Sequence, residues 1–305
     1  MPLKITKAIE PIEVTRTTLC LYSVPGIGKT SIASTAEKPL LLDFDHGAHR
    51  TKYRKDTVRV EKWEDVASVT QADLAPYKTV IVDTAGRALD ILSQKLIAEN
   101  SKFGMGGALT LKGFGQLKSE FIGWLRMLNG YGLDVILLCH SDEQRNGDEL
   151  IERLDMQGGS KNEIYKSADV MGRLYLEKGK RILNFSPTDT SFGKNPAALP
   201  PIEIPDFALE PAFLAGVIAT IKAKLNDMSV AQVEAQQEQE EWAGKFAAAE
   251  TAELLTAFVP VLETVREEAR KKIQLILVHV AKGKGFTWDK TASKFIAEPK
   301  TEAKP

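Results

Sequence analysis

Few cysteines and no long apolar segment limit what this chain can be. Cys20 and Cys139 are the only two cysteines in 305 residues, and each lies within an apolar run. Two isolated thiols are too few for a disulfide framework or a cysteine-rich metal cluster, so we interpret both as reduced core residues and expect a cytoplasmic protein. The first residues lack the apolar segment of a signal peptide, and no run reaches the length of a membrane span. We therefore expect neither export nor a membrane partner.

Net charge is also nearly absent. Lys and Arg number 40 against 41 Asp and Glu, so the formal net charge is -1. The net charge therefore neither supports nor excludes DNA as a partner, and any contact with nucleic acid would need a local basic patch. What the chain does have is 43% hydrophobic residues, enough for one α/β core and a smaller appendage.

Short apolar runs alternate with longer helical periods up to about residue 207. The runs are continuously apolar and often β-branched, which is typical of strands buried on both faces. Four such strands are expected, over 17–23, 39–45, 79–86 and 134–141. A hairpin is expected over 173–185, around a Lys-Gly-Lys turn. The predicted fold class is α/β, with a mostly parallel sheet covered by helices.

The composition changes after the apolar runs end. A Gln/Glu-rich stretch over 229–241 predicts a solvated helix or linker, and apolar residues at helical spacing between 262 and 280 predict a helix. We therefore divide the chain into a core, a helical linker and a small helical C-terminal module, over 1–207, 208–250 and 251–305.

One loop carries the strongest chemical signal. It consists of Ser23, Val24, Pro25, Gly26, Ile27, Gly28, Lys29, Thr30 and Ser31. A phosphate-binding P-loop needs glycines for close backbone approach, a lysine for the phosphates and a hydroxyl for Mg²⁺. Gly26, Gly28, Lys29 and Thr30 supply these groups, so we predict that all nine residues bind a nucleotide. Ser23 stands where the motif G-x-x-x-x-G-K-[ST] has its first glycine.

Polar residues close the other expected strands. Asp83 follows four apolar or small residues and is the predicted Walker B carboxylate, which orders Mg²⁺ together with Thr30. Asp45 is the candidate for orienting the attacking water, with Asp43 next in line. His140 closes the fourth strand, where it either contacts the γ-phosphate or is a buried imidazole with a structural role. Both interpretations of His140 remain open.

The predicted cofactors are ATP and Mg²⁺. The sequence Asp-Thr-Ala-Gly over 83–86 also suggests GTP, because small GTPases have D-x-x-G at this point. A GTPase further needs a guanine-recognition motif after a later strand, and the nearest match, over 160–163, departs from that pattern. ATP is therefore favoured.

Taken in order, these segments resemble RecA-type ATPases, most closely the phage nucleotide-binding proteins of the single-strand-annealing (Sak) group. The resemblance covers residues 15–205. It implies a RecA-like P-loop NTPase core whose fourth strand lies between the P-loop strand and the Asp83 strand. His140 then faces the γ-phosphate where recombinases carry Gln, and catalysis falls to Asp45, Lys29 and His140. Asp45, with a shorter side chain, stands where the family usually has Glu, a departure that bears on the efficiency of hydrolysis.

The resemblance also implies partners. The family binds single-stranded DNA and assembles into rings or filaments, which makes this chain an expected homo-oligomer of the host cytoplasm, with a single-strand-binding protein as a candidate partner. The matching DNA candidates are two expected loops, one over 141–169 and a Gly-rich one with two aromatic rings over 101–115; the alternative for either loop is a flexible connection without DNA contact.

The C-terminal module is a separate DNA candidate on grounds of charge. Residues 258–305 contain ten Lys and Arg against six Asp and Glu. Phe286 and Trp288 could stack with unpaired bases, or they could pack on the preceding helix.

Two functions stay open. The first is a DNA-dependent ATPase that promotes single-strand annealing or recombination, and the second is a nucleotide-switched replication or packaging accessory module with little hydrolysis. A nucleoside-phosphate kinase is a distant third, because no Arg-rich lid follows the core.

Overall fold

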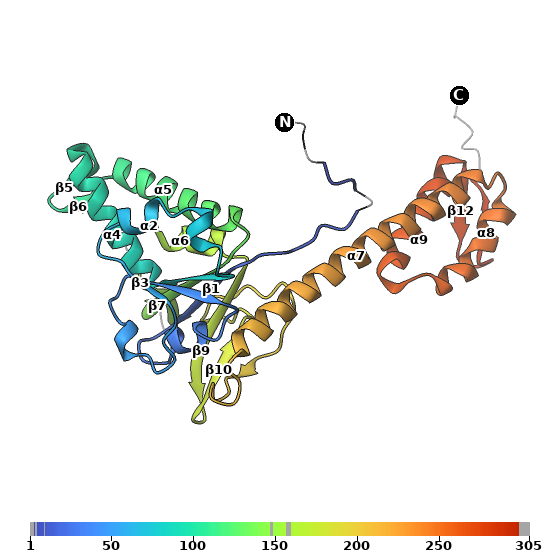
Figure 1. Cartoon of the computed structure of the whole chain (residues 1–305). Coiled ribbons are helices and arrows are strands. Elements are labelled where there is room, and N and C mark those ends of the chain that lie inside the picture. The colour runs from blue at the N-terminus through green and yellow to red at the C-terminus, as the bar shows by residue number, and fades with distance from the viewer. Residues whose placement is uncertain (1–2, 4, 9, 147–148, 157–159, 299–305) are drawn as a thin grey trace. The chain divides into compact units, whose positions relative to one another are not determined.

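The computed structural model describes residues 3, 5–8, 10–146, 149–156 and 160–298. The chain forms two compact units (Figure 1). The larger unit is Val14–Leu225, and the smaller consists of Met1–Glu13 with Asn226–Pro305. These units do not share the boundaries at 207 and 250 that we expected from the sequence. None of the described helices is both long and apolar enough to cross a membrane.

The larger unit is built on a nine-stranded sheet with the order β11-β10-β9-β1-β7-β4-β2-β3, and β8 pairs with β7. Strands β1, β2, β3, β4, β7 and β9 run parallel, and β8, β10 and β11 pair in the antiparallel sense. The predicted α/β class with a mostly parallel sheet is confirmed. The strands are β1 (Thr18–Ser23), β2 (Pro39–Asp43), β3 (Thr57–Arg59), β4 (Thr79–Asp83), β7 (Asp134–Asn146), β8 (Glu149–Leu154), β9 (Val170–Glu177), β10 (Lys180–Asn184) and β11 (Ile202–Glu203).

Helices cover both faces of this sheet. Figure 1 shows α4, α5 and α6 on one side, and Leu214 and Ile218 of α7 join the core on the other. Alternate residues of β1 enter the two cores: Cys20 and Tyr22 face α4 and α5, whereas Leu19 and Leu21 face α1 and α7. The helices are α1 (Lys29–Ala33), α2 (Glu64–Ala67), α3 (Gln71–Leu74), α4 (Ala85–Glu99), α5 (Leu111–Gly130), α6 (Ser160–Ser167) and α7 (Phe213–Ala248).

The two cysteines are free and fully buried, as expected. They are not isolated, however, because β1 and β7 are neighbours in the sheet and bring the two sulfur atoms to 3.7 Å.

Three predicted strand ends were wrong, and the first belongs to the strand expected over 39–45, which stops at Asp43. The strand expected over 79–86 stops at Asp83, and Ala85 already begins α4, because Thr84 takes the extended N-cap conformation that turns the chain into a helix. The strand expected over 134–141 continues to Asn146 and returns as β8. The Asn-Gly pair at 146–147 is a hairpin signal that the sequence analysis missed.

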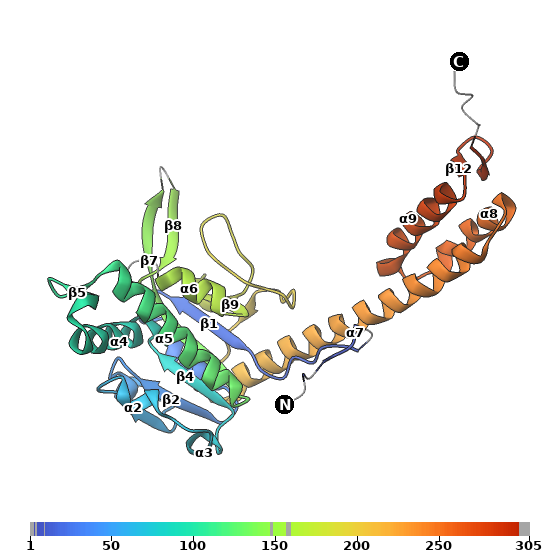
Figure 2. The same ribbon diagram turned by 90° about the horizontal axis from the view of Figure 1, so that it is seen from above.

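Both candidate DNA segments are more ordered than loops. Within 141–169, most of the described residues form the end of β7, β8 and α6, and the β7–β8 hairpin extends beyond the body of the unit (Figure 2). Within 101–115, β5 (Gly104–Met105) and β6 (Ala108–Leu109) form a small hairpin, and α5 begins at Leu111. The hairpin expected over 173–185 is present as β9 and β10.

The smaller unit has its own core. It contains the last turns of α7, α8 (Ala252–Val261), α9 (Glu267–Gly283) and a hairpin of β12 (Phe286–Asp289) and β13 (Lys294–Ala297), which the sequence analysis did not predict. Phe286 and Trp288 pack against this core, and the Trp288 ring meets Phe295 edge-on with 5.0 Å between ring centres. Of the two interpretations of these rings, packing is the one that the structure shows.

Candidate ATP site

The loop between β1 and α1 has the backbone of a phosphate cradle. Gly26 and Gly28 have φ angles of 85° and 101°, a left-handed conformation that favours glycine. Ser23, in contrast, is the last residue of β1 and lies beside His140 of β7 in the sheet register. A serine fits there because strand backbone is open to any residue, so the missing first glycine leaves the loop intact.

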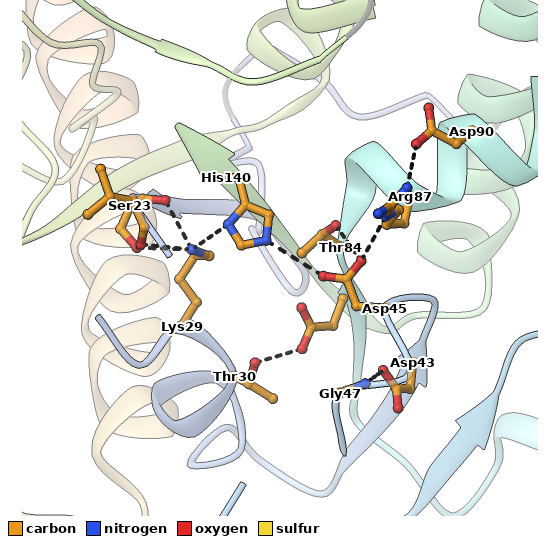
Figure 3. A network of polar contacts seen from close by, with 12 residues as sticks. Ser23, Lys29, Thr30, Asp43, Asp45, Gly47, Thr84, Arg87, Asp90 and His140 are labelled. Atoms are coloured by element: carbon orange, nitrogen blue, oxygen red, sulfur yellow. Dashed lines mark hydrogen bonds and ion pairs between the residues drawn. The ribbon is translucent and has the colours of Figure 1, made fainter. Parts of the chain in front are cut away.

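Lys29 is buried beneath this loop (Figure 3). Its Nζ donates to the carbonyl oxygen of Ser23 at 3.0 Å, to the Ser23 Oγ at 3.1 Å and to the Val24 carbonyl oxygen at 3.3 Å. Burial lowers the pKa of Lys29, and the nearby carboxylate of Asp83 only partly offsets this effect. A phosphate brought next to the ammonium group would stabilise its charge, because an anion compensates for lost hydration.

Thr30 and Asp83 form the second pair of the site. The Thr30 Oγ1 donates to Asp83 Oδ2 at 2.7 Å. Burial raises the pKa of Asp83, and the hydrogen bond from Thr30 only partly offsets it. A hydroxyl beside a carboxylate is an oxygen donor set that suits Mg²⁺, which binds proteins through few side chains together with substrate phosphates. The residues present therefore fit a magnesium nucleotide.

Asp43 and Asp45 lie near each other but do different things. The backbone amides of Phe44 and Asp45 donate to the Asp83 carbonyl oxygen, which fixes the end of β2 against β4. The Asp43 carboxylate accepts from the amides of Gly47 and Ala48, both at 2.9 Å. Asp43 therefore holds the turn after β2 and is not the reserve water-orienting residue that we expected.

The Asp45 carboxylate points into the site (Figure 3). Its partners are the Nε2 of His140 at 3.6 Å, the Nε of Arg87 at 3.5 Å and the Oγ1 of Thr84 at 3.4 Å. Burial by itself raises the pKa of Asp45, but its contacts with His140, Arg87 and Thr84 outweigh burial and hold that pKa below its ordinary value. Asp45 is therefore ionised near neutral pH and able to accept a hydrogen bond from water.

His140 joins the two halves of the site. It lies on β7, between the P-loop strand β1 and the Asp83 strand β4, as the resemblance implied. Its Nδ1 is 3.2 Å from Lys29 Nζ, and its Nε2 faces Asp45. Because an ammonium group only donates, Nδ1 accepts in this contact and the ring proton is on Nε2. The sheet thus brings all three predicted catalytic residues together.

A cavity of about 500 Å³ lies over these groups. Its lining includes Pro25, Gly26, Gly28, Lys29, Thr30, Ser31, Asp45, Asp83 and His140. Val24 contributes its carbonyl oxygen to Lys29, and the Ile27 side chain packs against the core instead.

A model of the AAA domain family matches residues 15–197, more than half of the chain. The chain belongs to the AAA domain family. This match confirms the P-loop NTPase class of the core and supports ATP binding and ATPase activity at the level of that class. No curated protein gave a significant match.

Two arginines of the AAA domain were missed by the sequence analysis. Arg50 lines the ATP cavity, and Arg87 contacts Asp45. Each follows a predicted carboxylate at short range, five residues after Asp45 and four after Asp83. The turn after β2 and the first turn of α4 bring the two arginines back to the site. No local sequence motif predicts this placement.

Proposed function

We propose that this chain is a DNA-dependent ATPase of the RecA-like, phage single-strand-annealing type, which promotes annealing or recombination of single strands. One observation carries the proposal. His140, which contacts Lys29 and Asp45, lies on the same continuous strand as the arm of the β7–β8 hairpin. A single strand bound along that hairpin would therefore act directly on a residue of the ATP site.

The residues have separable roles in hydrolysis. Lys29 and the glycine loop hold the phosphates, and Thr30 and Asp83 hold Mg²⁺, which neutralises phosphate charge when bound. Asp45 orients the attacking water and accepts its proton. His140 contacts both Lys29 and Asp45 and so keeps these two residues in place, and its Nε2 carries the proton that faces Asp45.

The two candidate DNA segments carry exposed cations. Arg145 is exposed on the hairpin arm, and Lys102 and Lys112 are exposed near the β5–β6 hairpin. Lys112 Nζ lies 6.0 Å from the centre of the Phe103 ring, a cation beside a planar group. Such pairs suit the backbone and bases of a single strand.

The same resemblance supports assembly into rings or filaments, which sedimentation with ATP and DNA would test.

The deciding experiment is ATP turnover with and without a single-stranded oligonucleotide. We expect turnover to rise on addition of DNA and to fall to background in Lys29→Ala. Arg145→Gln should raise the DNA concentration needed for half stimulation and leave turnover without DNA unchanged. Turnover that is identical with and without DNA, together with no DNA binding in the presence of ATP, would contradict the proposal.

The nucleotide-switched accessory module remains the second candidate because Asp45 is shorter than Glu and is held by Arg87 at 3.5 Å. Both features weaken a water-orienting base. DNA binding that requires ATP but never accelerates hydrolysis would favour this second function.

A further inference from the structure

A second cavity adjoins the ATP cavity in the larger unit. Its volume is about 550 Å³, within the range of about 300–1,000 Å³ that is typical of small-molecule sites. Asp45, Arg50 and His140 line both cavities. A ligand in the second cavity would therefore touch the same residues that face the bound nucleotide.

Both candidate DNA segments contribute to its walls. Leu109 and Phe114 come from the stretch 101–115, and Asp155 and Met156 follow the β7–β8 hairpin. Helix α4 supplies the remaining side, including Arg87 and Asp90. These segments are distant in sequence, yet they meet at one cavity next to the candidate reaction centre.

The lining suits a neutral, planar group with polar edges. The lining carries three carboxylates, on Asp45, Asp90 and Asp155, and two guanidinium groups, on Arg50 and Arg87. Because both signs of charge are present, the cavity suits neither a phosphate nor a simple cation. Phe114 is half-buried and offers a ring for stacking. A nucleobase combines two flat apolar faces with amino donors for carboxylates and acceptors for a guanidinium.

We propose that this cavity binds one unpaired nucleobase of the single strand, stacked on Phe114 and hydrogen-bonded to Asp90 or Asp155. This inference rests on the proposed DNA-dependent function and names the part of the DNA that is sensed. Arg87 contacts Asp45 at 3.5 Å and Asp90 at 3.4 Å. A base that engages Arg87 or Asp90 competes with these contacts, so it releases Asp45 to orient water.

The test compares two single-stranded oligonucleotides of equal length, one with bases and one built entirely of abasic sites. Turnover of ATP by the full chain is the readout, together with oligonucleotide binding by fluorescence anisotropy. The oligonucleotide with bases should stimulate turnover about 10-fold more than the abasic one, since the stacked base provides the coupling. Phe114→Leu should remove this difference. Tyr77→Leu removes a half-buried ring that lies outside the cavity lining and outside both candidate DNA segments, and it should keep the difference.

A filling variant guards against a misfolded Phe114→Leu protein. Ser93 lines the cavity, and Ser93→Phe should occupy the space, abolish the preference for bases and leave turnover without DNA unchanged. Equal stimulation by both oligonucleotides overturns the base site and leaves a DNA-dependent ATPase that senses the strand backbone. If neither oligonucleotide binds or stimulates turnover, the proposed function is overturned, and the base site with it.

Discussion

The two sides of the ATP cavity differ in how tightly their polar groups are held. On the P-loop side, the Thr30 Oγ1 lies 2.7 Å from Asp83 Oδ2, and the Lys29 Nζ donates to oxygens of the loop at 3.0–3.3 Å. On the hydrolytic side, Asp45 meets its partners at 3.4–3.6 Å, at or beyond the limit of a good hydrogen bond. We infer that the fold preforms the nucleotide-binding groups, whereas water orientation depends on a small rearrangement, which a single strand would supply under the proposed function.

The largest effect should come from the P-loop side, hereafter the tight side because its polar contacts are short. Lys29→Ala removes a buried cation that the phosphates would pair with, and loss of such a charge costs about 2–5 kcal/mol of binding, so ATP affinity should fall at least roughly 30-fold. Calorimetric titration with ATP measures this, with the exposed Lys62→Ala as the control. Unchanged affinity in Lys29→Ala would mean that the loop does not hold phosphate.

On the hydrolytic side, hereafter the loose side because its contacts are long, Asp45→Asn should lower ATP turnover without lowering ATP affinity. An amide cannot accept the proton of water, so turnover should fall about 10²- to 10⁴-fold while Mg-ATP affinity is kept. Asp43→Asn is the matched control, because that carboxylate accepts two backbone amides and its loss should lower the melting temperature more than turnover. Equal turnover in wild type and Asp45→Asn would move the catalytic role elsewhere.

The sequence predicts the tight side well and the loose side only in part. Gly26, Gly28, Lys29 and Thr30 belong to one contiguous motif, because a phosphate cradle is made by a single loop. The partners of Asp45 are Thr84, which caps the start of α4, Arg87 of α4 and His140 of β7, so only the folded sheet brings them together. The resemblance predicted the position of His140, because it placed the strand of His140 between the P-loop strand and the Asp83 strand.

The fold was predictable to a similar extent. Buried strands can be recognised from the sequence because both of their faces are apolar. The prediction of a loop was wrong for the β7–β8 hairpin, because its exposed arm is charged and therefore lacks the alternation of apolar and polar residues that indicates a strand. The β12–β13 hairpin went unpredicted because its rings, including Trp288, resemble a nucleic-acid patch and in fact pack into the core of the smaller unit.

A change at Arg87 should shift the pH dependence of turnover. The guanidinium helps to hold the pKa of Asp45 below its ordinary value, and Asp45 acts only when ionised. Turnover is therefore lost as pH falls through this pKa. In Arg87→Gln the pKa should rise, so the acidic limb of the pH profile should move to higher pH. An acidic limb at the same pH in both proteins would show that Arg87 does not set the ionisation of Asp45.

The smallest effect should follow from removing a hydroxyl on the loose side, which makes a matched pair with the same change on the tight side. Thr84→Val removes an Oγ1 that reaches Asp45 only at 3.4 Å, so turnover should change by no more than about threefold, since a contact at this length is weak. Thr30→Val removes the Oγ1 that lies 2.7 Å from Asp83 and would bind Mg²⁺, so the Mg²⁺ concentration for half-maximal turnover should rise roughly 10-fold or more. Titration of turnover with MgCl₂ measures both variants in one assay. Equal effects of the two substitutions would abolish the distinction between a preformed binding side and an adjustable hydrolytic side.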